Sequence, residues 1–132
     1  MIQRLQNRAA RIILGNFDFI NVRGLELVQQ LGWQSMEKRR DYYVASLMYK
    51  CMQGLAPIHL KNNIVMNSHT HEIPTRASSH CDVQIPQPHC ELFKRSFKYQ
   101  SAKIWNRLPP ELKTVNDIQQ FKINYKRLFF RP

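Results

Sequence analysis

Apolar residues recur at helical spacing along most of this chain, so helices are expected nearly throughout. In residues 1–14, one side of a first helix collects Ile2, Leu5, Ala9, Ile12 and Ile13. Gly15 is expected to end this helix, and Gly32 a second, short one. The longest helix is expected from Ser35, its N-cap, to Gly54, and its predicted buried stripe is Tyr43, Val44, Leu47, Met48 and Cys51.

The middle of the chain changes character. A short helix is expected after Pro57, where proline suits a first helical turn. Residues 67–92 then lack helical periodicity and are rich in proline and polar side chains, which predicts one long irregular loop. A connection of this length is uncommon in a compact domain, so it is expected to be either a binding loop or a poorly ordered segment.

The last third predicts two further helices. The first is expected to include Lys94 and has Phe97, Ile104, Trp105 and Leu108 on one side. Pro109 and Pro110 end it, because proline lacks a backbone donor and disfavours helix in the residue before it. The second begins near Asn116, and its apolar side chains are Ile118, Phe121, Tyr125 and Leu128. The predicted fold is therefore mainly α, with five or six short helices in a single domain covering residues 1–132.

Charge adds a clue to function. The 132 residues include 20 Lys and Arg against 9 Asp and Glu, a formal net charge of +11. This surplus is typical of nucleic-acid partners, because each phosphate that a cation neutralises releases condensed counterions. A basic surface that meets only solvent is the alternative. The lack of a long apolar run or a signal core, and an odd count of cysteines, predict an intracellular protein with no membrane partner.

Twelve cations lie off the apolar stripes and are the candidate phosphate-binding residues. They are Arg4, Arg8, Arg11, Lys38, Arg39, Lys94, Arg95, Lys98, Lys103, Arg107, Lys122 and Lys126. Between Glu91 and Glu111 there are five of them and no acid, so the phosphate-binding surface is expected there first. Aromatic residues alternate with cations in residues 93–99, a mixture suited to single strands, whose bases stack on rings. Helical spacing favours a core position for Phe97, Trp105 and Phe121.

The loop also holds a group of potential metal ligands: His69, His71, His80, Cys81, His89 and Cys90. Structural zinc sites pair their ligands at spacings such as C-x2-4-C, whereas the two His-Cys pairs here are adjacent residues nine positions apart. The pattern favours a polar loop, and no metal or cofactor is predicted. The nine acids are scattered and no phosphate-binding Gly-rich loop is present, so no catalytic residue is predicted either.

Four short blocks resemble a known family. The first is Trp105-Asn106-Arg107-Leu108-Pro109, with Leu112-Lys113 and Phe121-Lys122 after it. The others are Leu31-Gly32-Trp33 with Glu37-Lys38-Arg39-Arg40, then Met48-Tyr49-Lys50 with Gly54-Leu55-Ala56-Pro57, and then Thr75-Arg76 with Ser78. In this order they resemble the C-terminal, post-polymerase region of reverse transcriptases from jockey-like animal non-LTR retrotransposons.

The resemblance implies a nuclear, non-catalytic fragment of an RNA-directed DNA polymerase. Its partners would be RNA or DNA, held through phosphates, and the polymerase domain of a parent protein. The polymerase motifs of that family lie upstream of this region and are absent here. The alternative function is a protein-interaction or structural remnant that does not bind nucleic acid.

Overall fold

The computed structural model describes residues 2–67 and 81–130. Within these ranges the chain forms eight helices and no strand, which confirms the mainly α prediction. The helices are α1 (Ile2–Leu14), α2 (Gly24–Gln30), α3 (Met36–Met52), α4 (Ile58–Lys61), α6 (Glu91–Lys94), α7 (Phe97–Asn106), α8 (Pro110–Lys113) and α9 (Ile118–Phe129). Residues 81–90 contain no helix, as expected of the loop. Residues 68–80 of the predicted loop lie outside the described residues.

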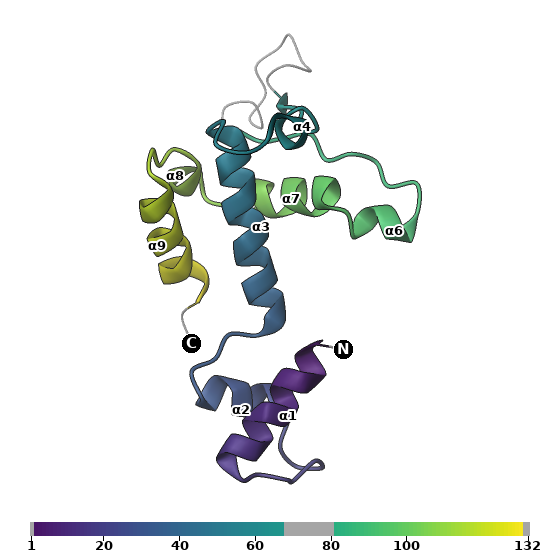
Figure 1. The fold of residues 1–132 in the computed structure, drawn as a ribbon, viewed down its shortest axis with the longest axis vertical. Helices are drawn as coiled ribbons and strands as arrows, with labels where there is room; N and C mark the ends of the chain where they lie inside the picture. Colours follow the sequence, from purple (N-terminus) through teal and green to yellow (C-terminus); the bar gives the residue numbers. More distant parts are fainter. Residues whose placement is uncertain (1, 68–80, 131–132) are drawn as a thin grey trace.

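Helix α3 is the axis of the molecule (Figure 1). Helices α7 and α9 both pack against it, and Figure 1 shows them on its two sides. Helices α1 and α2 pack on each other near the start of α3, while α4 lies near its end. None of the described helices is long and apolar enough to cross a membrane.

Two helix starts differ from their prediction. The helix expected around Trp105 is split, because Ser96 takes an extended conformation and its hydroxyl accepts a hydrogen bond from the Tyr99 backbone N–H (3.4 Å). Helix α6 therefore ends before α7 begins. At the start of α9 the N-cap is Asp117, whose carboxylate accepts from the Gln120 N–H (3.1 Å). An aspartate there also complements the positive end of the helix dipole.

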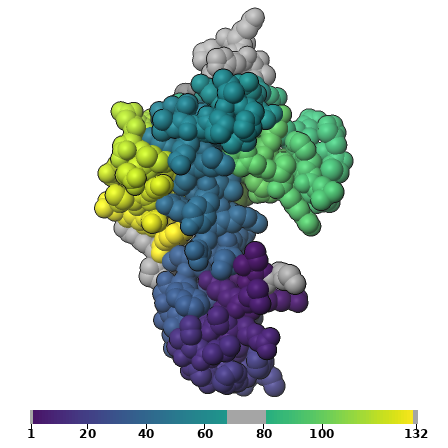
Figure 2. All heavy atoms as spheres, viewed as in Figure 1, coloured from purple at the N-terminus to yellow at the C-terminus, as the bar shows by residue number. Residues whose placement is uncertain are grey.

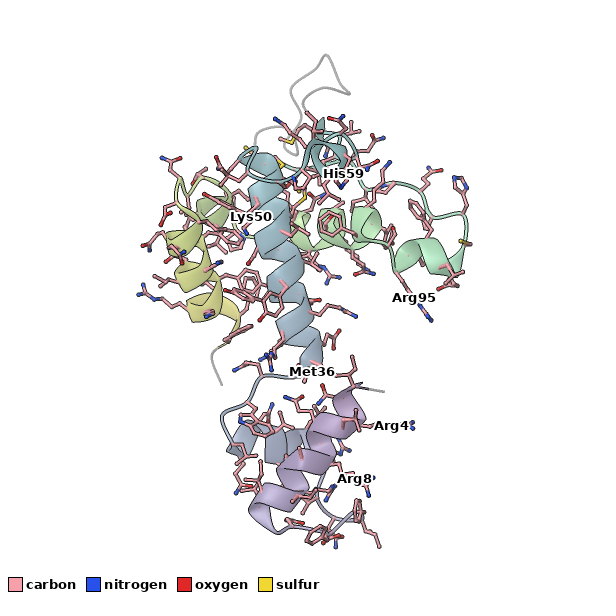
Figure 3. All side chains as sticks on the ribbon, in the orientation of Figure 1. Arg4, Arg8, Met36, Lys50, His59 and Arg95 are labelled. Atoms are coloured by element: carbon pink, nitrogen blue, oxygen red, sulfur yellow. The ribbon has the colours of Figure 1, made fainter. Side chains whose placement is uncertain are left out.

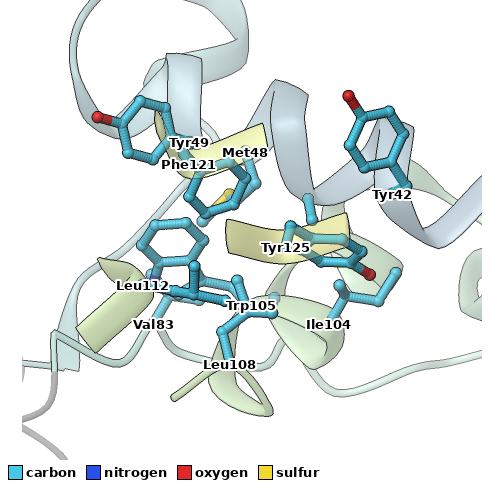
Figure 4. Packing of buried hydrophobic residues seen from close by; sticks show 12 residues of the cluster. Tyr42, Met48, Tyr49, Val83, Ile104, Trp105, Leu108, Leu112, Phe121 and Tyr125 are labelled. Carbon is cyan, nitrogen blue, oxygen red and sulfur yellow. The ribbon is translucent and has the colours of Figure 1, made fainter. Parts of the chain in front are cut away.

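The main core lies where α7, α8 and α9 meet α3 (Figure 4). Trp105, Phe121 and Tyr49 are its largest fully buried side chains. The rings of Tyr49 and Phe121 stack with centroids 4.5 Å apart, and the Tyr49 hydroxyl donates to the Val115 carbonyl (2.6 Å). The expected core positions of Trp105 and Phe121 are thus confirmed, whereas Phe97 is half-buried and lies outside this cluster.

Trp105 and Asn106 also hold residues 81–83 of the long loop. The Trp105 indole N–H donates to the Cys81 carbonyl (2.9 Å). The Asn106 side chain accepts from the Val83 N–H (3.0 Å) and donates to the Val83 carbonyl (2.9 Å), as a neighbouring strand would. Val83 is buried and forms an isolated antiparallel bridge with Met66. This block of the sequence therefore joins α7 to both ends of the long loop.

A buried ion pair lies beside this anchor. The Lys113 ammonium donates to the Asp82 carboxylate at 2.5 Å, and the two side chains are 2% and 19% exposed. Lysine is almost never buried without a partner, because removing a charge from water is costly. The pair ties α8 to the residue that precedes Val83.

Helices α1 and α2 have a separate, small core made of Ala10, Leu27 and Val28. Arg11 is buried beside it and donates to two loop carbonyls, Asp18 O (2.7 Å) and Val22 O (2.6 Å). The link to α3 is polar: Gln6 donates to the Gln34 carbonyl (2.8 Å) and the Met36 N–H donates to Gln3 (2.9 Å).

The predicted buried faces of α3 and α9 are confirmed in part, because Met48, Cys51, Phe121 and Tyr125 are buried as expected. One position on each of these two faces, and the face of α1, were predicted wrongly. In α3 the buried tyrosine is Tyr42, whereas Tyr43 is 61% exposed, because α7 and α9 cover a different arc of the helix from the one expected. Leu128 of α9 is exposed as well. The apolar side chains of α1 do share one side, but that side faces solvent. Spacing determines which residues share a face, whereas tertiary packing decides which face is covered.

Candidate nucleic-acid interface

A concave surface runs along α3 between α1 and the α6–α7 arm, and Figure 2 shows the molecule hollowed there. One hollow, of about 880 Å³, includes Ile2, Met36, Arg39, Arg40 and Tyr43 in its wall. A second hollow, of about 340 Å³, is lined by Arg40, Val44, Arg95, Phe97 and Gln100. Arg40 lies in the wall of both hollows, so the two hollows adjoin along α3. We call the surface formed by Arg39, Arg40, Tyr43, Arg95, Phe97 and Gln100 the basic groove.

The basic groove has little negative charge to balance its arginines. Among the residues that line its two hollows, Glu37 is the only acid. Arg40 also meets Asp41 at 3.4 Å, but both side chains remain partly exposed, and pairs of this kind contribute little. A phosphate can therefore replace Asp41 as the partner of Arg40 at small cost.

Aromatic rings lie among these cations. Tyr43 is exposed in the wall of the larger hollow, and its ring meets that of buried Tyr42 edge-on at 5.3 Å. Phe97 lines the smaller hollow. An exposed ring held from behind by packed neighbours is a surface on which a base can stack.

The five cations expected between Glu91 and Glu111 do not form one patch. Arg95 lines the groove, and Figure 3 shows it pointing toward the side on which Arg4 and Arg8 leave α1. Lys94 instead pairs with Glu91, and this hydrogen bond raises the pKa of Lys94 and lowers that of Glu91. The pair is exposed, so Lys94 remains charged but already has a partner.

Cations on α7 lie on two sides of the helix. Lys103 and Arg107 are one turn apart and lie on the same side of the helix as Gln100. Lys98 is five residues from Lys103, about 140° around the helix axis, and belongs to another face. All three side chains are exposed.

Other predicted residues lie elsewhere. Lys38 lines a hollow with Trp33 and Phe130, away from Arg39. Lys122 and Lys126 are on α9, which Figure 1 shows across α3 from the arm, and the Lys126 ammonium lies 5.3 Å from the centre of the Tyr42 ring. Arg4 and Arg8 line a hollow of their own with Phe19.

The expectation that Arg11 faces outward is wrong. Its side chain is 7% exposed, its guanidinium donates to two loop carbonyls, and it lies 4.5 Å from the centre of the Phe19 ring. These contacts hold the turn between α1 and α2. Arg11 is therefore a structural residue that holds this turn.

Sequence reasoning missed four residues of the groove, among them Gln100, which was not a candidate, and Phe97, which was expected in the core. Arg40 was part of a resembling block but not of the candidate set, and Tyr43 was expected in the core. The position of Arg40 four residues before Val44 carried the missing signal, because α3 offers that side to the arm.

Thiols and potential metal ligands do not add a second site in the described part of the chain. Cys51 is buried, and burial raises its pKa, whereas Cys81 and Cys90 are exposed; all three are free. No group of three or more His, Cys, Asp or Glu gathers within residues 2–67 and 81–130. His69, His71 and His80 lie outside the described residues, as do Thr75, Arg76 and Ser78 of the resembling block.

Comparisons with known proteins leave the family open. No protein-family model matches the chain, and neither the curated proteins nor the solved structures give a significant match. The resemblance to reverse transcriptases stays a prediction from the four motifs.

Proposed function

We propose that the chain is a non-catalytic nucleic-acid-binding module that holds single-stranded RNA or DNA in the basic groove. One observation carries the proposal: two adjoining hollows share Arg40. Arg39 and Tyr43 line the first hollow with it, and Arg95 and Phe97 line the second. Guanidinium groups pair well with phosphates, and the rings offer stacking surfaces that tolerate any base.

The retrotransposon-like motifs support the same role. In that family the polymerase chemistry belongs to another region, and this chain would hold template RNA or target DNA beside it. The net charge of +11 supplies long-range attraction to any such strand.

Binding through the groove gives a measurable salt dependence. Each phosphate contact on a single strand contributes a slope of about −0.7 in a plot of log K against log salt concentration. Three arginines that each hold one phosphate therefore account for about 2 units of slope.

The test is a triple charge reversal, Arg39→Glu/Arg40→Glu/Arg95→Glu. Fluorescence anisotropy with a labelled oligo-dT and an oligo-rU of equal length, at salt concentrations from about 50 to 200 mM, gives the slope. The variant should bind both strands more weakly and lose about 2 units of slope. Thermal melting should be unchanged, because exposed charges contribute little to stability.

A matched control reverses Lys122, Lys126 and Arg127 to Glu on α9. This control makes the same change in net charge on the other side of α3, so it should keep most of the slope. Equal losses in the two triple variants would show that net charge alone attracts nucleic acid, without a localised site. A groove variant that binds like the wild type would remove the proposal.

A further inference from the structure

Helix α1 exposes an apolar face that nothing in the described chain covers. Ile2, Leu5, Ile12 and Ile13 are 64%, 63%, 62% and 58% exposed, and Ala9 lies between them. They recur at spacings of three, four and one, so they form a single stripe about 16 Å long. We call these five residues the α1 apolar face.

The opposite side of α1 packs against the rest of the chain. Gln6, Ala10 and Arg11 are buried there, and Gln3 and Gln6 bond to the chain around Gln34 and Met36. A solvent-facing helix normally does the reverse and buries its apolar side. This inversion leaves four branched side chains in water on an otherwise well-held helix.

Charge beside the stripe limits what can cover it. Arg8 is three residues after Leu5 and four before Ile12, so it stands next to both, and Arg4 continues this margin one turn earlier. No acid occurs in α1, and both arginines are exposed. The surface is thus an apolar stripe with one cationic margin.

We propose that the α1 apolar face binds an amphipathic helix of a protein partner that carries Asp or Glu along one edge. Such a helix places its own apolar stripe on the face and its carboxylates against Arg4 and Arg8. Helix pairs of this kind take their energy from the stripe and their orientation from the flanking charges.

A second copy of this chain fits the face less well. In an antiparallel pair of α1 helices related by a two-fold axis, the cationic margin of one helix lies against the cationic margin of the other. Arg8 would therefore face the arginines of the second copy. Like charges across such a seam are unfavourable. An acidic partner turns the same geometry into attraction.

A membrane surface is also a poorer fit. Helices that lie on anionic membranes keep a solvated polar side rich in Lys and Arg. In α1 the polar side is packed against the rest of the chain, and its exposed cations are two arginines at one margin.

The test uses a designed probe, a labelled helical peptide with Leu at heptad positions a and d and Glu at e and g, and its twin with Lys in place of Glu. In fluorescence anisotropy, the wild-type chain should bind the Glu peptide with a Kd at least about tenfold lower than its Kd for the Lys twin. Leu5→Gln/Ile12→Gln should weaken that binding by at least about tenfold. Arg8→Glu should weaken binding of the Glu peptide and improve binding of the Lys twin.

Two controls separate this site from other surfaces. Ile123→Gln/Leu128→Gln replaces two apolar residues of α9 that are also more than half exposed, and this variant should bind the Glu peptide like the wild type. The groove variant Arg39→Glu/Arg40→Glu/Arg95→Glu should retain most of the peptide binding, so its loss would place the peptide in the basic groove and overturn the proposal. Circular dichroism melts confirm that each variant is folded.

The proposal also fails in three further cases. One is no saturable binding of the Glu peptide up to about 1 mM. A second is a dimer in analytical ultracentrifugation that Leu5→Gln/Ile12→Gln dissociates, which would assign the face to a second copy. The third is Leu5- and Ile12-dependent binding to phosphatidylserine vesicles without binding to the peptide.

Discussion

Trp105→Ala is expected to lower the free energy of unfolding by about 3–5 kcal/mol, the usual range for removing a large aromatic side chain from a core. Trp105 is 1% exposed and packs where α3, α7 and α9 converge (Figure 4). The substitution also leaves the Cys81 carbonyl without its indole donor. Both losses act on the contact between α7 and the end of the long loop.

Urea unfolding followed by circular dichroism measures this effect. Trp33→Ala is the control, because Trp33 is 37% exposed and its loss should cost much less. A Trp105→Ala chain that unfolds like the wild type but no longer binds oligo-dT would mean that Trp105 stacks on bases and has no role in the core.

Asp82→Ala is expected to cost about 3 kcal/mol, near the lower end for breaking a buried ion pair, because it leaves the Lys113 ammonium buried without its anion. Lys113→Met should cost less. Methionine keeps the apolar volume of the lysine stem, and Asp82 is sufficiently exposed to be hydrated on its own.

The double variant Asp82→Ala/Lys113→Met decides whether charge is the cause. It should be more stable than Asp82→Ala alone, because no charge is then buried without a partner. Glu111→Ala, at an exposed acid on the same helix as Lys113, should be near neutral. Urea midpoints of the wild type, the two single variants and the double variant provide the comparison. A loss of stability in the double variant equal to the sum of the two single losses would contradict a coupled pair.

Much of the fold could be predicted from local sequence signals. Helical spacing, the glycines that end helices and Pro109-Pro110 gave the mainly α class, and spacing placed Trp105 in the core. Arg11 shows the limit of such reasoning. Its register on α1 matched Arg4 and Arg8, but whether it binds phosphate or loop carbonyls depends on the path of residues 16–22 in space, which spacing does not contain.

The candidate site was less predictable for the same reason. Arg39 and Arg95 are far apart in sequence and line adjoining hollows only because α7 packs across α3. Tyr43 and Tyr42 are neighbours with the same chemistry, and tertiary packing alone decides which ring is left for a ligand. A single sequence marks the basic character of the chain but not the side on which the cations meet.

The separation of the two hydrophobic clusters affects how this chain opens. The described residues of the α1–α2 cluster and of the main core have no side chain in common, and hydrogen bonds of Gln3, Gln6 and Gln34 join the two parts. Opening of α1 and α2 therefore leaves the main core intact, and native-state hydrogen exchange should give their amides a lower opening free energy than those of α3. A partner bound to α1 raises that local value by RT ln(1 + [L]/Kd), so protection of α1 amides reports its occupancy directly.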